Sequence, residues 1–159
     1  SLSKWSSVID YALTVENSVQ VLIVGDSELV PGYAKAGDAG ADLRASEAGR
    51  IGPGERLLVP TGVKIALPDG FVGLVHPRSG LAVKQGITVL NTPGTIDSGY
   101  RGELKVVLLN TSNDEFVFER GERIAQLVIQ KYEKAEFVEV SSLPETERGE
   151  GGFGSSGRN

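Results

Sequence analysis

Short apolar runs separated by glycine- and proline-containing turns dominate the hydrophobic pattern of this chain. Runs of this length, bounded by turn residues, are typical of β-strands rather than of helices. The expected strands are residues 19–24, 56–67 (interrupted at Pro60 and Gly62), 71–75, 87–90, 103–110, 115–118, 123–130 and 137–140. Many strands at this spacing predict an all-β, jelly-roll-like sandwich or barrel.

Two turns between these runs carry more specific predictions. Pro68-Asp69-Gly70 is a tight-turn sequence followed at once by a strand, so we expect a hairpin there. The glycines within residues 94–103 indicate a second tight hairpin. Residues 106–109 are apolar at every position, which fits a two-sheet core or a subunit interface.

Two segments have a helical pattern. Residues 79–86 predict one short helix that begins with Ser79 as its N-cap and ends at Gly86. A second, amphipathic helix is indicated by apolar residues three and four positions apart, namely Trp5, Val8, Ile9, Ala12 and Leu13. We assign no role to residues 1–20, which are an N-terminal extension or a tag.

Length and composition favour a single domain. A chain of 159 residues with 40% hydrophobic residues is long enough to build one core. We expect the β domain to span residues 21–144. Residues 145–159 are first charged and then rich in glycine and serine, so we expect a flexible C-terminal arm.

The residue inventory limits the chemistry. The chain has no cysteine and a single histidine, His76, which excludes disulfides, thiol nucleophiles and zinc sites built from cysteine or several histidines. We expect His76 to be structural. The remaining carboxylates, arginines, hydroxyls and backbone amides suit hard oxygen-preferring ions such as Mg²⁺.

Charge and hydropathy bear on partners and location. A net charge of −5 without a basic cluster argues against a nucleic-acid partner, although a few arginines are enough to hold one nucleotide. Apolar runs are too short to span a membrane, and the N-terminus lacks a signal-peptide pattern. We therefore expect a cytoplasmic protein without a membrane partner.

Three short motifs each allow a structural and a functional interpretation. Arg78-Ser79-Gly80 at the helix start is either a plain cap or an anion site, to which Arg78 adds a bidentate contact. Asp97, among glycines, is either a turn residue or a general base that holds a water molecule. Asp42 is either a turn residue or a metal-site carboxylate.

The tail contains a G-x-G-x-x-G string formed by Gly152, Gly154 and Gly157. A dinucleotide site is excluded, because no strand precedes the string and no helix has room to follow it. The tail is either disordered, or a mobile lid in which an arginine, an aromatic ring and two hydroxyls contact a ligand. P-loop and nucleophile-elbow motifs are absent.

Five segments taken in order resemble the motifs of the trimeric dUTPase family. They are residues 39–43 (AGADL), 77–82 (PRSGLA), 91–103 (NTPGTIDSGYRGE), 123–127 (RIAQL) and 148–157 (RGEGGFGSSG). The resemblance covers residues 21–157. It implies a jelly-roll fold, a homotrimer with active sites at subunit interfaces, and an arm that closes over another subunit's site.

The resemblance also implies an activity: Mg²⁺-dependent hydrolysis of dUTP to dUMP and pyrophosphate, which keeps uracil out of DNA and supplies dUMP for dTMP synthesis. Asp97 is expected to deprotonate the water that attacks the α-phosphorus, and Gln126 to help hold that water. Asp42 is expected to bind Mg²⁺ through water. The phosphates are expected to lie against Arg78, Ser79 and Gly80.

The remaining implied contacts concern the nucleoside and the arm. Uracil and deoxyribose are expected to be read by Asn91, Gly94, Thr95, Ile96, Tyr100 and, with a weaker match, Lys105. The arm is expected to supply Arg148 to the terminal phosphate and Phe153 to the base, together with contacts from Gly154, Ser155 and Ser156. Two alternatives stay open, a dCTP deaminase on the same fold and a catalytically silent nucleotide-binding trimer.

Overall fold

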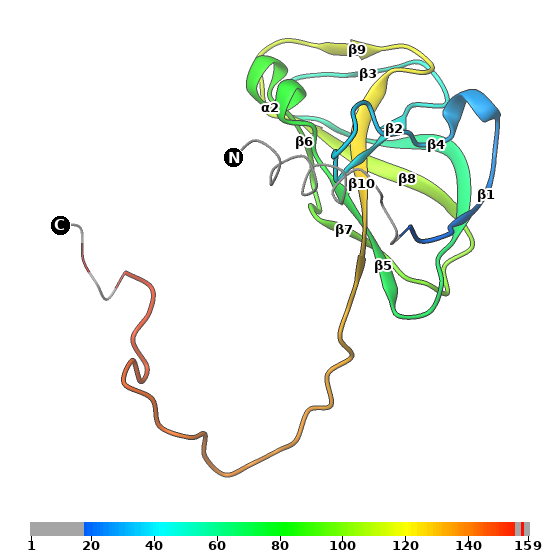
Figure 1. Ribbon diagram of the computed structural model, residues 1–159. Coiled ribbons are helices and arrows are strands. Elements are labelled where there is room, and N and C mark those ends of the chain that lie inside the picture. Colours follow the sequence, from blue (N-terminus) through cyan, green and yellow to red (C-terminus); the bar gives the residue numbers. More distant parts are fainter. Residues whose placement is uncertain (1–17, 155–156, 158–159) are drawn as a thin grey trace, which may run out of the picture.

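The computed structural model describes residues 18–154 and residue 157, and Figure 1 shows the order of the elements. Strands account for nearly all of the regular structure. They are β1 (Leu22–Val24), β2 (Ala41–Arg44), β3 (Gly49–Ile51), β4 (Arg56–Ala66), β5 (Phe71–His76), β6 (Ile87–Val89), β7 (Gly94–Ile96), β8 (Glu103–Asn110), β9 (Phe116–Phe118) and β10 (Arg123–Lys131). Within the described residues, one short helix, α2 (Ser79–Gln85), and one 3₁₀ turn, η1 (Ser27–Leu29), accompany the strands.

The strands form two four-stranded antiparallel sheets and one two-stranded ribbon. The first sheet has the order β1-β4-β8-β6, the second has the order β2-β10-β5-β7, and β3 pairs with β9. One continuous core joins the two sheets, because alternate side chains of each sheet, such as Leu108, Val106, Leu127 and Val75, belong to a single buried cluster. The predicted all-β, jelly-roll-like fold is confirmed.

The turn at Pro68-Asp69-Gly70 exists, but the predicted hairpin around it is wrong. Phe71 N–H donates to the carbonyl of Pro68 over 3.2 Å, and Gly70 has a φ of 84°, a conformation that favours glycine. The strands on either side do not pair with each other, since β4 belongs to the first sheet and β5 to the second. A short turn between the layers of a sandwich has the same local sequence as a hairpin turn.

The second predicted hairpin, within residues 94–103, is wrong for the same reason. β7 pairs with β5 in the second sheet, whereas β8 pairs with β4 and β6 in the first. Asp97 lies in the turn that links the two sheets, where Tyr100 N–H donates to the Asp97 carbonyl over 3.1 Å. The turn therefore lies at the edge of the core rather than at the end of a free ribbon.

Several other expectations are corrected. β2, β3 and η1 were not predicted, so Asp42 lies on a strand rather than in a turn, and residues 137–140 are not a strand. The N-cap of α2 is Arg78 rather than Ser79, and no side chain caps the helix. Gly86 ends α2 in the left-handed conformation, as predicted. The predicted helix at residues 5–13 lies outside the described residues.

An extended arm follows β10. The last strand ends at Lys131, and from there the chain runs away from the body and turns back in a wide arc (Figure 1). Exposed apolar side chains are spread along the arm, with Phe137 93% and Leu143 82% exposed. No helix in the described part of the chain has the length and apolar character that a membrane crossing requires.

Candidate active site

Two hollows bring together most of the residues that the sequence singled out. The first, named here the polar pocket, has a volume of about 620 Å³ and is lined chiefly by Lys35, Asp38, Gly40, Asp42, His76, Arg78, Ser79, Gly80, Arg123 and Gln126. The second, the edge pocket, has a volume of about 340 Å³ and is lined by Asn91, Gly94, Thr95, Ile96, Asp97, Tyr100, Lys105 and neighbouring core residues.

The polar pocket lies on the outer face of the second sheet. Asp42 on β2 and His76 on β5 are both register partners of Gln126 on β10, so the three side chains form a row across three strands. Their chain neighbours, such as Leu43 and Leu127, face the core instead. Because side chains alternate along a strand, the buried face fixes this polar row on the opposite face.

The carboxamide of Gln126 has a defined orientation. Its Nε2 donates a hydrogen bond of 2.9 Å to the carbonyl of Pro77. Its Oε1 then lies against Gly40, so closely that a Cβ at position 40 would collide with it. The amide oxygen of Gln126 is therefore presented toward the loop before β2, where it is able to accept a hydrogen bond from water.

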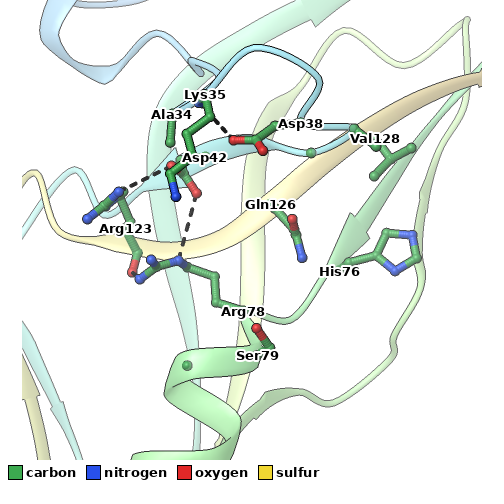
Figure 2. Close-up of a pocket in the computed structure, with 13 residues that line it drawn as sticks. Ala34, Lys35, Asp38, Asp42, His76, Arg78, Ser79, Arg123, Gln126 and Val128 are labelled. Atoms are coloured by element: carbon green, nitrogen blue, oxygen red, sulfur yellow. Dashed lines mark hydrogen bonds and ion pairs between the residues drawn. The ribbon is translucent and has the colours of Figure 1, made fainter.

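Two arginines contact Asp42, one at each carboxylate oxygen, as Figure 2 shows. Arg78 Nε lies 3.7 Å from Oδ1, and Arg123 NH1 lies 3.6 Å from Oδ2. Arg78 NH1 also donates to the carbonyl of Arg123 over 3.2 Å. The Asp42 side chain is only 16% exposed, so the carboxylate is largely sheltered beside two positive charges.

The start of α2 forms one wall of the polar pocket. Ser79 and Gly80 occupy its first turn, where backbone N–H groups have no acceptor within the helix. Gly80 has open space where a Cβ would lie, so a ligand is able to approach the backbone closely. With Arg78 directly before the helix, this wall suits an anion such as phosphate.

The edge pocket opens between the two sheets along β7. Ile96 and Val75 from the second sheet and Val89, Leu104 and Val106 from the first form its apolar floor. Polar groups lie at its rim, including the exposed Asp97 and Asn91. This combination of an apolar slot and a few polar groups suits a flat heterocycle.

Tyr100 is fixed at the mouth of the edge pocket. Its hydroxyl donates to the carbonyl of Glu103 over 2.8 Å. Gly102 leaves room for the ring, since a Cβ there would lie 2.6 Å from the ring carbon that carries the hydroxyl. Glu103 Oε2 is buried without a hydrogen-bond partner among the described residues.

The predicted site residues thus fall into three groups. One chain brings Asp42, Arg78, Ser79, Gly80 and Gln126 together in the polar pocket, and it brings the 91–105 set together in the edge pocket. Arg148, Phe153 and Gly154 lie on the arm, in contact with neither pocket of the same chain. Ser155 and Ser156 lie outside the described residues.

Four polar or charged residues of the polar pocket, namely Lys35, Asp38, His76 and Arg123, received no site role from the sequence. Asp38 closes a turn by accepting a 2.9 Å hydrogen bond from the backbone N–H of Lys35. His76 was expected to be structural, yet it lines the pocket. Arg123 stands three positions before Gln126, a spacing that regular alternation places on opposite faces of a strand. The sequence therefore held no signal that would have paired them.

Arg120 is an ionisable group outside these pockets, in the turn after β9. The pKa of Arg120 is raised, mainly by its hydrogen bonds to Glu28 and Asp26. These contacts, with a further bond to the Ser46 carbonyl, tie the turn after β9 to η1. Arg120 lines neither pocket and links surface segments of the fold.

A wall that suits an anion on the outer face of the second sheet and an apolar slot at the margin of the core, both on a jelly-roll sandwich, are the features of a nucleotide-binding class of protein. The sequence profile of the dUTPase family matches residues 9–157, so it takes in part of the N-terminal segment that the motifs left unassigned. The chain belongs to the dUTPase family.

Individual relatives agree with this assignment. The deoxyuridine 5'-triphosphate nucleotidohydrolase of Bifidobacterium longum is 61% identical over 126 residues, which is 79% of this chain and 80% of the relative. The dUTPase of Staphylococcus bacteriophage 80alpha, solved with dUpNHpp, has a TM-score of 0.79 at 31% identity and covers 89% of this chain and 99% of its own.

A third relative concerns a metal. A mutant dUTPase from phage phi11 of S. aureus, described with a structural Mg(II) ion, has a TM-score of 0.69 at 25% identity. The match covers 79% of this chain and 98% of the phage protein.

Proposed function

We infer that this chain is a dUTP diphosphatase, which hydrolyses dUTP to dUMP and pyrophosphate. Family membership, the name of the 61% identical relative and the analogue bound to the phage 80alpha enzyme support the activity. The observation that carries it is the pair of pockets, because one suits a flat base and the other suits phosphates. By removing dUTP the enzyme keeps uracil out of DNA, and its product supplies dTMP synthesis.

At the nucleoside end, the edge pocket receives uracil and deoxyribose. Asn91 and the backbone around Gly94, Thr95 and Ile96 read the base edge, where a mispaired buried polar group costs about 1–3 kcal/mol. The fixed ring of Tyr100 packs under the sugar, where a 2′-hydroxyl would clash. Lys105 lies at the same mouth and contributes a positive charge near the substrate.

At the scissile bond, water attacks the α-phosphorus and the bond from that phosphorus to the bridging oxygen breaks. Asp97, exposed at the rim of the edge pocket, takes the proton from the attacking water, and pyrophosphate leaves. Gln126 supports the same water with its oriented amide oxygen. Positioning and charge stabilisation supply most of the acceleration, as in other phosphoryl transfers.

At the phosphate end, Arg78, Ser79 and Gly80 hold the phosphates against the start of α2. The described residues include no cluster of three or more His, Cys, Asp or Glu side chains able to hold a metal by themselves. A lone carboxylate such as Asp42 fits Mg²⁺ held mainly by the triphosphate, since this ion keeps several waters and needs few protein ligands. When bound, Mg²⁺ neutralises charge on the phosphates.

The placement of the pockets supports an assembly of several copies. The polar pocket lies on the outer face of the second sheet, whereas the edge pocket opens toward its core face. One nucleotide is not able to contact both faces of one sheet, so a complete site takes its two pockets from different copies. We propose the homotrimer that the sequence motifs imply, with three shared sites.

The arm completes the site. It leaves the body at Lys131 with Phe153 fully exposed, which suits a segment that reaches a neighbouring copy. There Arg148 binds the terminal phosphate and Phe153 stacks on the base, with contacts from Gly154, Ser155 and Ser156. Residues 145–159 thus act as a lid on the domain of residues 21–144. A nucleoside triphosphate substrate also fits the cytoplasmic location expected from the sequence.

The test is pyrophosphate release from dUTP, dCTP, dTTP and UTP with Mg²⁺, alongside an Asp97→Asn variant. We expect fast release from dUTP alone and a loss of at least about 10²-fold in kcat for the variant. Ammonia release from dCTP would instead identify a deaminase. Nucleotide binding without turnover would identify a silent trimer.

A further inference from the structure

An irregularity in the backbone pairing of β10 with β2 places Arg123 in the polar pocket. In the pairing of β10 with β2, Arg123 is opposite Arg44, whereas Ala125 is opposite Leu43, so two steps on β10 match one step on β2. This is a β-bulge at Ile124, where Ile124 and Ala125 are both buried in succession. The extra residue places Arg123 on the same face of the sheet as Gln126.

The bulge aims Arg123 at one target. Its NH1 lies 3.6 Å from Asp42 Oδ2, and its backbone carbonyl accepts the 3.2 Å hydrogen bond from Arg78 NH1. Asp42 itself is anchored at the edge of the sheet, because its N–H donates to the carbonyl of Gly32 over 2.8 Å. The carboxylate is thus held from the backbone on one side and by two guanidinium groups on the other.

The two arginines differ in what else they can do. Arg78 stands directly before α2, at the wall that suits phosphate. When a nucleotide binds, Arg78 therefore has a second partner, the phosphates, besides Asp42. Arg123 contacts the other carboxylate oxygen of Asp42, from a different side than Arg78 does (Figure 2). If Arg78 turns to the phosphates, Arg123 alone remains to hold Asp42.

We propose that Arg123 is a positioning residue that keeps Asp42 oriented toward the metal–nucleotide complex while Arg78 is transferred from Asp42 to the phosphates. This proposal rests on the proposed function, because it takes Asp42 as the carboxylate that meets Mg²⁺ through water. It adds that the two arginines have different roles, since Arg78 binds the phosphates and Arg123 holds Asp42. Polar partners behind a metal ligand commonly alter metal affinity by about 10–100-fold when they are removed.

The test compares nucleotide binding with and without metal. Binding of dUpNHpp is measured by titration calorimetry in EDTA and across a series of Mg²⁺ concentrations, for the wild type, Arg123→Gln and Arg123→Lys. We expect Arg123→Gln to raise the Mg²⁺ concentration for half-maximal tightening by about 10-fold. Binding in EDTA is expected to stay within about twofold. Arg123→Lys is expected to recover part of the loss, since it keeps the charge but not the planar fork.

Two further variants locate the effect. Arg50→Gln is the matched control, since Arg50 pairs with Glu115 over the same 3.6 Å but lines neither pocket. Its Mg²⁺ dependence is expected to equal that of the wild type. Asp42→Asn is expected to lose the Mg²⁺ response, and the double variant with Arg123→Gln is expected to be no worse, because the two residues act together.

The outcomes separate this proposal from the proposed function. Equal weakening with and without Mg²⁺ would show that Arg123 touches the nucleotide directly and would overturn the positioning role. An unchanged Mg²⁺ response in Arg123→Gln, with Asp42→Asn affected, would overturn it as well and leave the function intact. A wild type that neither binds dUpNHpp nor hydrolyses dUTP would overturn the function.

Discussion

The close contact between Gly40 and Gln126 gives the sharpest prediction about catalysis. In a Gly40→Ala variant the new Cβ would lie 3.0 Å from Gln126 Cδ and 3.1 Å from Gln126 Cβ, and it would overlap with Oε1. Carbon atoms in favourable contact are about 3.5–4.0 Å apart, so the carboxamide has to move. Gln126 is partly exposed, so rotation of its side chain is able to remove the contacts of Cδ and Oε1, while the 3.1 Å contact of Cβ is relieved by a small shift of the backbone.

The magnitudes favour a catalytic rather than a structural defect. Rotation breaks the bond from Gln126 Nε2 to the Pro77 carbonyl, and one such bond contributes about 0.5–1.5 kcal/mol net. A loss of about 1 kcal/mol lowers the melting temperature of a domain of this size by about 2–4 °C. A displaced positioning group, in contrast, costs on the order of 10²-fold in rate. We therefore expect kcat to fall about 10–100-fold in an enzyme that is still folded.

The assay is steady-state pyrophosphate release from dUTP, paired with thermal unfolding of the same preparations. Gly32→Ala is the matched control, because a Cβ at Gly32 meets nothing within 4 Å and the site lies in the same loop region. Gln126→Ala is expected to have the kcat of Gly40→Ala, and the double variant is expected to be no slower than either. A Gly40→Ala enzyme with wild-type kcat would refute the role given to Gln126.

Two further predictions concern the arm and the core. Phe153→Ala is expected to raise KM by about 10-fold while keeping turnover at saturating dUTP, because base stacking contributes about 1–3 kcal/mol; complete loss of turnover would contradict this. Asn110→Ala is expected to lower the free energy of unfolding by about 2–4 kcal/mol in urea titrations, because the buried Nδ2 donates to the carbonyls of Ile51 and Asp114, over 2.9 and 2.8 Å, and both would lose that bond. A loss below about 1 kcal/mol would contradict that account.

The strands were predictable from the sequence because each carries its own signal. Apolar runs between turn residues located β4, β5, β8 and β10 to within a residue or two. β2 was missed because its four residues lie between glycines and include two charged positions on the outer face. The run at residues 137–140 has a strand-like composition, but in a single chain it has no neighbour to pair with.

Pairing was less predictable than strand position. A turn such as Pro68-Asp69-Gly70 sets the local direction of the chain, but the partner of each strand depends on which surfaces become buried together. Here β4 packs its apolar face against the second sheet and pairs with β8, which starts 37 positions after β4 ends. Non-local contacts of this kind leave no trace in a short window of sequence.

The site residues, like the strands, were predictable individually, but their spatial grouping was not. Motifs placed Arg78, Asp97 and Gln126 among the candidate residues, and the structure shows that Arg78 and Gln126 share a pocket while Asp97 occupies another. Arg123 was within a quoted motif but had no role, because only the bulge at Ile124 turns it toward Asp42. A bulge without a glycine has no residue that marks it in the sequence.

Alternation along the strands explains why one chain holds two partial sites rather than a whole one. Beyond its bulge, β10 buries Ala125 and Leu127 and turns Gln126 to the outer face, where Gln126 lies beside Asp42. An apolar slot for a base needs apolar walls, which are found at the margin of the core. Ile96 and Val75 line the edge pocket there. In this fold, a ligand that is apolar at one end and highly charged at the other would find its two environments on different faces of the second sheet. In the proposed trimer, identical copies would supply both faces at one place, and the arm that extends from the body of one copy would reach a neighbouring copy.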